Sequence, residues 1–262
     1  MIRQRSLILP AVLAGSALVL ALGLAISSSG GRRAAGSPAR GVAALIDATA
    51  PSTDYFNAQF CGAVLVAPDV ALTAAHCVDG RTPERIHVVV GADNLCRDHE
   101  ITGTRTDVLR IDLHPLYDAD AGRYDLALLT LGTSFSAEVR RIALDQPPSG
   151  QATGLGWGRA SYGGVPACRL MRVDLDLLSA AHCGDAVPPD GSRRFDPDAM
   201  ICAVPNDAGA DSCIGDSGGP LIAGDMNQGA ILGVVSWGRG CAEGIPGIYA
   251  RAGLFQGATW KE

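Results

Sequence analysis

Short apolar runs separated by turn-forming residues limit the fold of this chain more than any other feature. In the first half they are rich in Val, Ile and Leu and bounded by Gly, Pro and Asp, at residues 42–46, 60–67, 70–73, 86–90, 108–111 and 126–131. In the second half they occur at residues 151–156, 169–177, 200–203, 220–222 and 230–237. Runs of this length, with turns between them, are typical of strands in β-barrels or sandwiches. We therefore predict an all-β protein in two β-rich halves, with a short helix only near residues 252–260.

Composition agrees with this prediction and excludes one class of function. The chain has 262 residues, of which 47% are hydrophobic, and this is ample for a packed core. Its 33 Gly and 15 Pro, against 18% charged residues, favour a turn-rich protein over one of long helices. The formal net charge of −6 leaves no basic surface large enough to predict nucleic-acid binding. We expect protein or peptide partners and no nucleic acid.

The N-terminus has the layout of a secretory signal peptide over residues 1–27. Arg3 and Arg5 precede an apolar run at residues 7–25, which small residues follow. We therefore predict a secreted, extracellular protein, with retention of this run as a single membrane anchor as the alternative. Residues 28–41 are Ser, Gly, Ala, Arg and Pro, which predicts a flexible lead-in. The folded domain is then residues 42–262, with halves at about 42–135 and 136–262.

One serine, Ser217, lies in a glycine-rich loop within residues 211–221. Asp216 precedes it, and Gly218 and Gly219 follow it. Backbone N–H groups exposed in such a loop can stabilise an oxyanion. A serine hydroxyl is a poor nucleophile at its own pKa, so this interpretation requires a histidine base that is itself held by a carboxylate.

His76 and Asp125 meet that requirement. His76 comes where an apolar strand ends, directly before Cys77, in a turn that a disulfide can hold rigid. Asp125 precedes Leu-Ala-Leu-Leu, so its carboxylate enters the interior at the start of a buried strand and needs a partner there. If that partner is one ring nitrogen of His76, the other nitrogen can accept the proton of Ser217.

In these segments the chain resembles the trypsin-like serine proteases of the chymotrypsin fold. Leu-Thr-Ala-Ala-His-Cys at 72–77, Asp-Leu-Ala-Leu-Leu at 125–129 and Gly-Asp-Ser-Gly-Gly-Pro at 215–220 match its three signatures in the order His, Asp, Ser. Gly-Trp-Gly at 156–158, Ser-Trp-Gly at 236–238 and Pro-Gly-Ile-Tyr at 246–249 extend the match over residues 42–260. The resemblance implies two six-stranded antiparallel β-barrels with the active site between them.

The resemblance also assigns roles to residues of the second half. It makes Ser217 the nucleophile, with the N–H groups of Gly215 and Ser217 as the oxyanion hole. It places Asp211 at the floor of a substrate pocket that Gly238 and Gly247 leave open, next to Ser236 and Trp237. These roles imply an endopeptidase that cleaves after Arg or Lys through an acyl-enzyme. We expect a monomer without cofactor, and protein inhibitors are possible partners.

Eight cysteines, an even number, suit four disulfides in an exported protein, although their spacing alone leaves the pairing open. By resemblance Cys61 pairs with Cys77, Cys183 with Cys202, and Cys213 with Cys241. We hypothesise that the remaining two, Cys96 and Cys168, also pair. No paired C-x-x-C spacing indicates zinc, and the segment 92–100, where some family members bind calcium, is short and carries Cys96. We predict no metal.

Two alternatives to this site can be weighed from chain order. A second Ala-Ala-His-Cys ends at Cys183, but His182 follows Asp125 and is expected to be a surface or structural residue. His87, His99 and His114 carry no catalytic motif. Gly-x-Ser-x-Gly at 215–219 also fits the nucleophile elbow of α/β-hydrolases, a fold that needs a histidine after its serine. No histidine follows His182, which excludes an esterase of that fold.

The N-terminus departs from the family pattern. In the family, Asp216 receives the ammonium of a new terminus, Ile-Val-Gly-Gly, which this chain lacks. Residues 28–31, Ser-Ser-Gly-Gly, occupy that register, and signal peptidase could create the Ser28 terminus directly; cuts after Arg33 or Arg40 are alternatives. The alternative function is a catalytically impaired, secreted binding protein on the same fold. Ile214, where a polar residue is common, should make the pocket rim more apolar.

Overall fold

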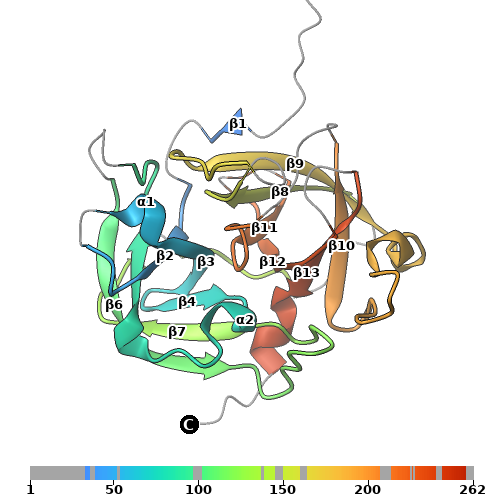
Figure 1. Cartoon of the computed structure of the whole chain (residues 1–262), viewed down its shortest axis with the longest axis horizontal. Helices are drawn as coiled ribbons and strands as arrows, with labels where there is room; N and C mark the ends of the chain where they lie inside the picture. Colours follow the sequence, from blue (N-terminus) through green and yellow to red (C-terminus); the bar gives the residue numbers. More distant parts are fainter. Residues whose placement is uncertain are drawn as a thin grey trace, which may run out of the picture.

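Two β-barrels packed against each other form the protein (Figure 1). The structure is a computed structural model, and it describes residues 33–35, 39–51, 54–96, 102–136, 139–144, 150–159, 164–206, 214–224, 226, 228–239 and 244–257. The blue and green strands of the first half make one barrel, and the yellow to red strands of the second half make the other. The all-β class predicted from the short apolar runs is confirmed.

The first barrel is a closed ring of antiparallel strands in the order β2-β3-β4-β7-β6-β5. Their bounds are β2 Val42–Asp47, β3 Gln59–Ala67, β4 Val70–Thr73, β5 Ile86–Val90, β6 Thr104–Leu113 and β7 Ala127–Leu131. Pairing between β2 and β5 closes the ring. Closure leaves no open sheet edge, so the backbone hydrogen bonds of the strands are satisfied within the barrel.

The second barrel closes in the same way, through the order β9-β10-β13-β12-β11-β8 and a further pairing of β8 with β9. Its strands are β8 Gly150–Gly156, β9 Met171–Leu178, β10 Met200–Pro205, β11 Pro220–Ala223, β12 Ile231–Trp237 and β13 Gly247–Arg251. The apolar runs had not indicated β13, which lies between β10 and β12. With it, the two six-stranded barrels implied by the family resemblance are confirmed.

Strand β2 connects the two barrels because its side chains alternate between two cores. Ala43 and Leu45 belong to the core of the first barrel. Val42, Ala44 and Ile46, on the opposite face, pack in a second cluster that contains Leu155 and Trp157 of the second half. Every residue from 42 to 46 is therefore buried, which explains why this strand is apolar throughout rather than alternating.

Among the described residues, helical structure is limited to short turns. Two single-turn helices, α1 Tyr55–Ala58 and α2 Ala75–Val78, follow or precede strands of the first barrel. The 3₁₀ turns are η1 Pro83–Arg85, η3 Ala180–His182, η4 Gly184–Ala186 and η5 Ala252–Gly257. The helix predicted at the C-terminal tail is η5, shown in red in Figure 1. Its Leu254 and Phe255 pack against the core of the first barrel.

A two-residue strand, β1 Arg33–Ala34, lies within the lead-in expected to be flexible. Arg33 is paired with Arg172 and Ala34 with Met171 on β9, and Ala35 N–H donates to the carbonyl of Leu170 (2.9 Å). This part of the lead-in therefore extends the sheet of the second barrel. The expected Ser28 terminus lies outside the described residues.

Three disulfides between described residues hold loops against the barrels. Cys61–Cys77 ties β3 to α2, and Cys183–Cys202 ties the η3 turn to β10. Cys96–Cys168, the hypothesised pair, spans 72 residues and joins the segment after β5 to the segment before β9. Crosslinks of this kind contribute about 2–4 kcal/mol of stability each. Cys213 and Cys241 lie outside the described residues.

Within the part of the chain that the structure describes, no helix has the length and apolar character needed to cross a bilayer.

Candidate active site

The turn that carries His76 is fixed on both sides. Strand β4 ends at Thr73, whose buried hydroxyl donates to the carbonyl of Gly62 on β3 (2.7 Å). The following residues, Ala74 and Ala75, are fully buried, and Cys77 is bonded to Cys61. The small alanines let the chain turn tightly against the barrel wall. The ring of His76 is thus held rigidly, although about a third of its side chain remains exposed (36%).

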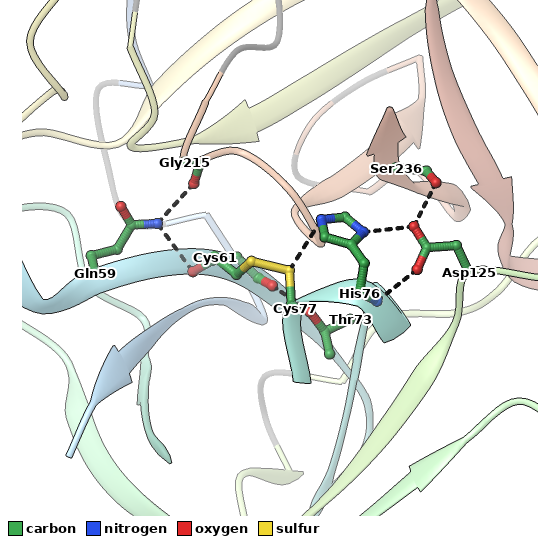
Figure 2. The surroundings of a disulfide bond; sticks show 9 residues. Gln59, Cys61, Thr73, His76, Cys77, Asp125, Gly215 and Ser236 are labelled. Carbon is green, nitrogen blue, oxygen red and sulfur yellow. Dashed lines mark hydrogen bonds and ion pairs between the residues drawn. A yellow bond between two sulfur atoms is a disulfide. The ribbon is translucent and has the colours of Figure 1, made fainter. Parts of the chain in front are cut away.

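His76 and Asp125 face each other through two hydrogen bonds (Figure 2). The backbone N–H of His76 donates to Oδ1 of Asp125 (2.8 Å), and Nδ1 of its ring lies 2.7 Å from Oδ2. A carboxylate can only accept, so Nδ1 carries the proton in this pair and Nε2 has the free lone pair. Nε2 is therefore the atom of His76 that can take a proton from a substrate or nucleophile.

Asp125 has a third donor, which comes from the second barrel. The hydroxyl of Ser236, on β12, donates to Oδ2 of Asp125 (2.6 Å). Burial pushes the pKa of Asp125 up, since the carboxylate is only 3% exposed, but hydrogen bonds from His76 and Ser236 outweigh burial and leave the pKa below its ordinary value. Asp125 thus stays ionised at neutral pH and can stabilise a charged imidazole.

The loop of Ser217 lies against the first barrel beside the His76 turn. The N–H of Gly62 donates to the carbonyl of Ser217 (2.7 Å), and Nε2 of Gln59 donates to the carbonyl of Gly215 (2.8 Å; Figure 2). A Cβ added to Gly218 would lie only 2.2 Å from the hydroxyl of Thr73, and φ of Gly218 is +76°. Glycine is thus required at 218, and the close approach brings Ser217 next to the residues that precede His76.

The side chains of Ser217 and His76 are not hydrogen-bonded to each other in the described structure. Nε2 of His76 instead lies 3.7 Å from the sulfur of Cys77. Catalytic hydrogen bonds are often long before substrate binds. The backbone contacts above bring the Ser217 loop against Gly62 and Thr73, just before the turn that carries His76. Cys61, His76 and Cys77 also form a group with metal-ligand spacing, but both sulfurs are in the disulfide and offer no thiolate to a metal.

The peptide between Ile214 and Gly215, whose N–H was expected in the oxyanion hole, is held in one orientation. The carbonyl of Ile214 accepts the N–H of Arg159 (2.9 Å). Because carbonyl and N–H point in opposite directions in a trans peptide, the N–H of Gly215 points away from Arg159. Gly215 has φ +96°, a conformation that side chains disfavour. Ile214 itself is 58% exposed.

Asp216 is enclosed by the Gly-Trp-Gly segment at 156–158. Asp216 is 2% exposed, and its carboxylate accepts the N–H of Gly158 (2.8 Å). A Cβ on Gly156 would lie 2.1 Å from Oδ1 of Asp216, and one on Gly158 would lie 2.5 Å from Cγ. Both glycines are therefore needed for Asp216 to turn inward. The N-terminus expected to pair with it lies outside the described residues.

Comparison with known proteins agrees with this geometry. A family model described as Trypsin matches residues 15–258. The chain belongs to the trypsin family of serine proteases. It is 37% identical over 202 residues to a trypsin of Saccharopolyspora erythraea, covering 75% of this chain and 84% of that protein. It is 40% identical over 205 residues to trypsin-1 of Astacus astacus (74% and 84%), and 35% identical over 216 residues to trypsin eta of Drosophila erecta (79% and 79%).

Membership of the trypsin family implies that the substrates are peptides or proteins. The residues expected to bind the substrate lie at the end of β12 and the start of β13. Ser236 and Trp237 end β12, Gly238 follows them, and Gly247 begins β13. A Cβ on Gly238 would lie 3.7 Å from Cα of Gly247, so the two glycines face each other closely. Asp211, the expected floor of the pocket, lies outside the described residues.

The remaining histidines of this trypsin-family chain have other partners. His182 is exposed in η3 and lies 2.8 Å from the hydroxyl of Ser179, at the surface as predicted. His114 is buried and stacked on Tyr124, and burial lowers its pKa. Nδ1 of His87 lies 3.0 Å from Oδ1 of Asp107. His99 lies outside the described residues.

Two interactions at the site were not predicted from the sequence. Ser236 was assigned only to substrate binding, yet its hydroxyl holds Asp125. Gln59, which holds the carbonyl of Gly215, carried no motif at all. Their bonds join the two barrels, which is why no local pattern could reveal them.

Proposed function

We propose that this protein is a secreted serine endopeptidase that hydrolyses peptide bonds after Arg or Lys. The observation that carries the proposal is the convergence of His76, Ser236 and the backbone of residue 76 on the buried carboxylate of Asp125, beside the loop of Ser217. An arginine-linked chromogenic peptide tests the activity. Release of the chromophore by the purified protein is expected, and its absence at any enzyme concentration would contradict the proposal.

The proposed reaction runs through an acyl-enzyme. The hydroxyl oxygen of Ser217 attacks the peptide carbonyl as its proton passes to Nε2 of His76, and Asp125 stabilises the imidazolium. The N–H groups of Gly215 and Ser217 hold the negative oxygen of the tetrahedral intermediate, where losing one donor typically costs about 3 kcal/mol of barrier. His76 then protonates the leaving amine. Water, activated in the same way, releases the acyl group from Ser217.

Asp211 is proposed to select the basic side chain, and Asp211→Ser tests it. The carboxylate pairs with a guanidinium or ammonium group, and without such a partner its burial is costly. We expect the substitution to lower the preference for Arg over Leu peptides, measured as a ratio of kcat/KM, by about 100-fold or more. Asp198→Ser, which changes an exposed aspartate, is the matched control. An unchanged ratio in Asp211→Ser would refute the pocket assignment.

Residues 1–27 are proposed to be removed on export, which leaves Ser28 as the mature terminus beside Asp216. Strand β1 supports this choice over the other two cuts. Cleavage after Arg33 would divide β1, and cleavage after Arg40 would remove it together with the carbonyl of Arg40, to which Nε of Arg140 donates. N-terminal sequencing of the secreted protein should therefore read Ser28, whereas a start at Ala34 or Gly41 would contradict the proposal.

A further inference from the structure

A pocket of about 480 Å³ lies beside the loop that carries Asp125. Residues 191–197, in the connection before β10, form most of its wall, and Ala121 and Arg123 complete it from the Asp125 loop. Among the residues that line it, three are arginines, Arg123, Arg193 and Arg194, and one is an aspartate, Asp196. The pocket therefore has more positive than negative side chains.

Arg193 is held in place in this pocket by contacts that leave its positive charge without a carboxylate partner among the described residues. Its guanidinium carbon lies 5.6 Å from the ring centroid of Trp237, and Nη2 donates to the carbonyl of Ala119 (3.4 Å). No carboxylate among the described residues pairs with it. Arg123 differs, because its Nε lies 2.6 Å from Oδ2 of Asp196 and its charge is balanced. A carboxylate that enters the pocket therefore finds Arg193 available.

Trp237 connects the pocket to the candidate active site, because it contacts Arg193 of the pocket wall. Trp237 follows Ser236, whose hydroxyl holds Asp125. Gly122, on the loop of Asp125, is buried against the same ring, and a Cβ there would lie 2.9 Å from Nε1 of Trp237. The Nε1 edge of Trp237 thus packs against the Asp125 loop. The guanidinium of Arg193 lies over the ring of the same tryptophan.

Other acids near the pocket do not neutralise Arg193. Asp118 and Asp190 are exposed, and their carboxylates accept the backbone N–H groups of Ala121 and Ser192. Asp120 and Asp198 are exposed on the same two loops and do not line the pocket. These charges remove any long-range positive field, so an attraction to Arg193 has to act at contact distance.

We propose that Arg193 makes this pocket a subsite for an acidic side chain of the substrate. The inference rests on the proposed function, which places the basic residue just before the scissile bond, between Gly238 and Gly247. A substrate strand that binds along Ser236 and Trp237 from that point continues toward Arg193. The acidic residue is therefore upstream of the basic residue, beyond its immediate neighbour. The guanidinium, stacked on Trp237, presents its N–H groups to both carboxylate oxygens.

Paired peptides test the subsite. Each pair has Arg before the scissile bond and either Glu or its neutral isostere Gln at one upstream position, and kcat/KM is measured for both. At one upstream position we expect kcat/KM of the wild-type protein to be about 5-fold higher for the Glu peptide than for the Gln peptide, which is the effect of a partly exposed ion pair. The ratio should shrink at high salt, because about 1 M salt screens charges beyond roughly 3 Å.

Variants assign the effect to Arg193. Arg193→Gln should bring the Glu/Gln ratio close to one, and Arg193→Glu should reverse it and favour Lys at the same position. Arg105→Gln makes the same change of net charge at an exposed position on β6, in the first barrel, and should leave the ratio unchanged. Because each ratio compares two peptides on one enzyme, a loss of folded protein cancels.

The outcomes separate this inference from the proposed function. Cleavage of the Arg–Gln peptides with no preference for Glu at any position overturns the subsite and leaves the protease assignment intact. A Glu preference that persists in Arg193→Gln overturns the role of Arg193. If the wild-type protein cleaves none of the peptides, the proposed function fails, and the inference that rests on it fails too.

Discussion

Replacing Ser217 by Ala is expected to lower kcat/KM for an arginine peptide by about a million-fold. Removing the nucleophile of a Ser-His-Asp site alone costs about as much as removing the whole triad. A residual acceleration of roughly 10³ to 10⁴ over the uncatalysed reaction should remain from the oxyanion hole and from binding. Steady-state kinetics with the chromogenic peptide measures the loss, at enzyme concentrations high enough to detect the remainder.

The substitution should not disturb the fold, which makes the result interpretable. The contact that holds this residue to β3 uses its backbone carbonyl, which accepts the N–H of Gly62 (2.7 Å). Thermal unfolding of Ser217→Ala should therefore match that of the wild type. Ser179→Ala, which removes an exposed hydroxyl near His182, is the matched control and should keep full activity. Activity close to the wild-type level in Ser217→Ala would assign the nucleophile elsewhere.

Asp125→Asn is expected to lower kcat by about 10⁴-fold at neutral pH. Three donors converge on the carboxylate: the backbone N–H of His76, its ring Nδ1 and the hydroxyl of Ser236. An amide has one acceptor oxygen and an NH₂ group, so at least one donor must face another donor. If the NH₂ group faces Nδ1, the ring proton moves to Nε2, which can then no longer accept the proton of Ser217.

The surface pair of His87 and Asp107 is a control for this substitution. Their atoms lie 3.0 Å apart, and Asp107 is 72% exposed. Asp107→Asn makes the same chemical change to a histidine–aspartate pair on β5 and β6, which has no hydrogen bond to the Ser217 loop among the described contacts, and it should leave kcat unchanged. Equal losses in the two variants, or no loss in Asp125→Asn, would contradict the role given to Asp125.

The pH dependence of stability should also reflect Asp125. Its folded pKa lies below the ordinary value of 3.8, so its ionised form is favoured by folding. The resulting stabilisation is complete above the pKa of the unfolded chain and is lost as the pH falls through the lower, folded pKa. Mild acidification should therefore not remove this contribution.

Strand positions were largely predictable because most of the strands are short apolar runs. The expected bounds of β4 and β5 agree with the structure to the residue. β6 extends well beyond its predicted core at 108–111, because its ends are polar and partly exposed and so carried no apolar signal. β13 begins at a glycine and has only Ile248 and Tyr249 as large apolar residues, too few to stand out.

The site was predictable only where its residues lie in local motifs. The pairing of His76 with Asp125 followed from the motifs around each residue. The hydrogen bonds of Ser236 to Asp125 and of Gln59 to Gly215 could not be predicted from local motifs. In each pair the two residues are 111 or 156 positions apart in the chain and lie in different halves of the protein. Arg193 was missed for the same reason, since its place beside Trp237 depends on how the loop before β10 folds over β12. These contacts exist only once the two barrels have packed.

In the proposed mechanism, His76 and Asp125 activate the hydroxyl of Ser217 as a nucleophile. A fluorophosphonate reagent, which reacts covalently with an activated serine, tests it most directly when mass spectrometry locates the adduct after digestion. We expect one adduct per molecule, on the peptide that contains Ser217, and expect it to form much more slowly in Asp125→Asn. No adduct, or an adduct on another residue such as Ser236, would contradict it.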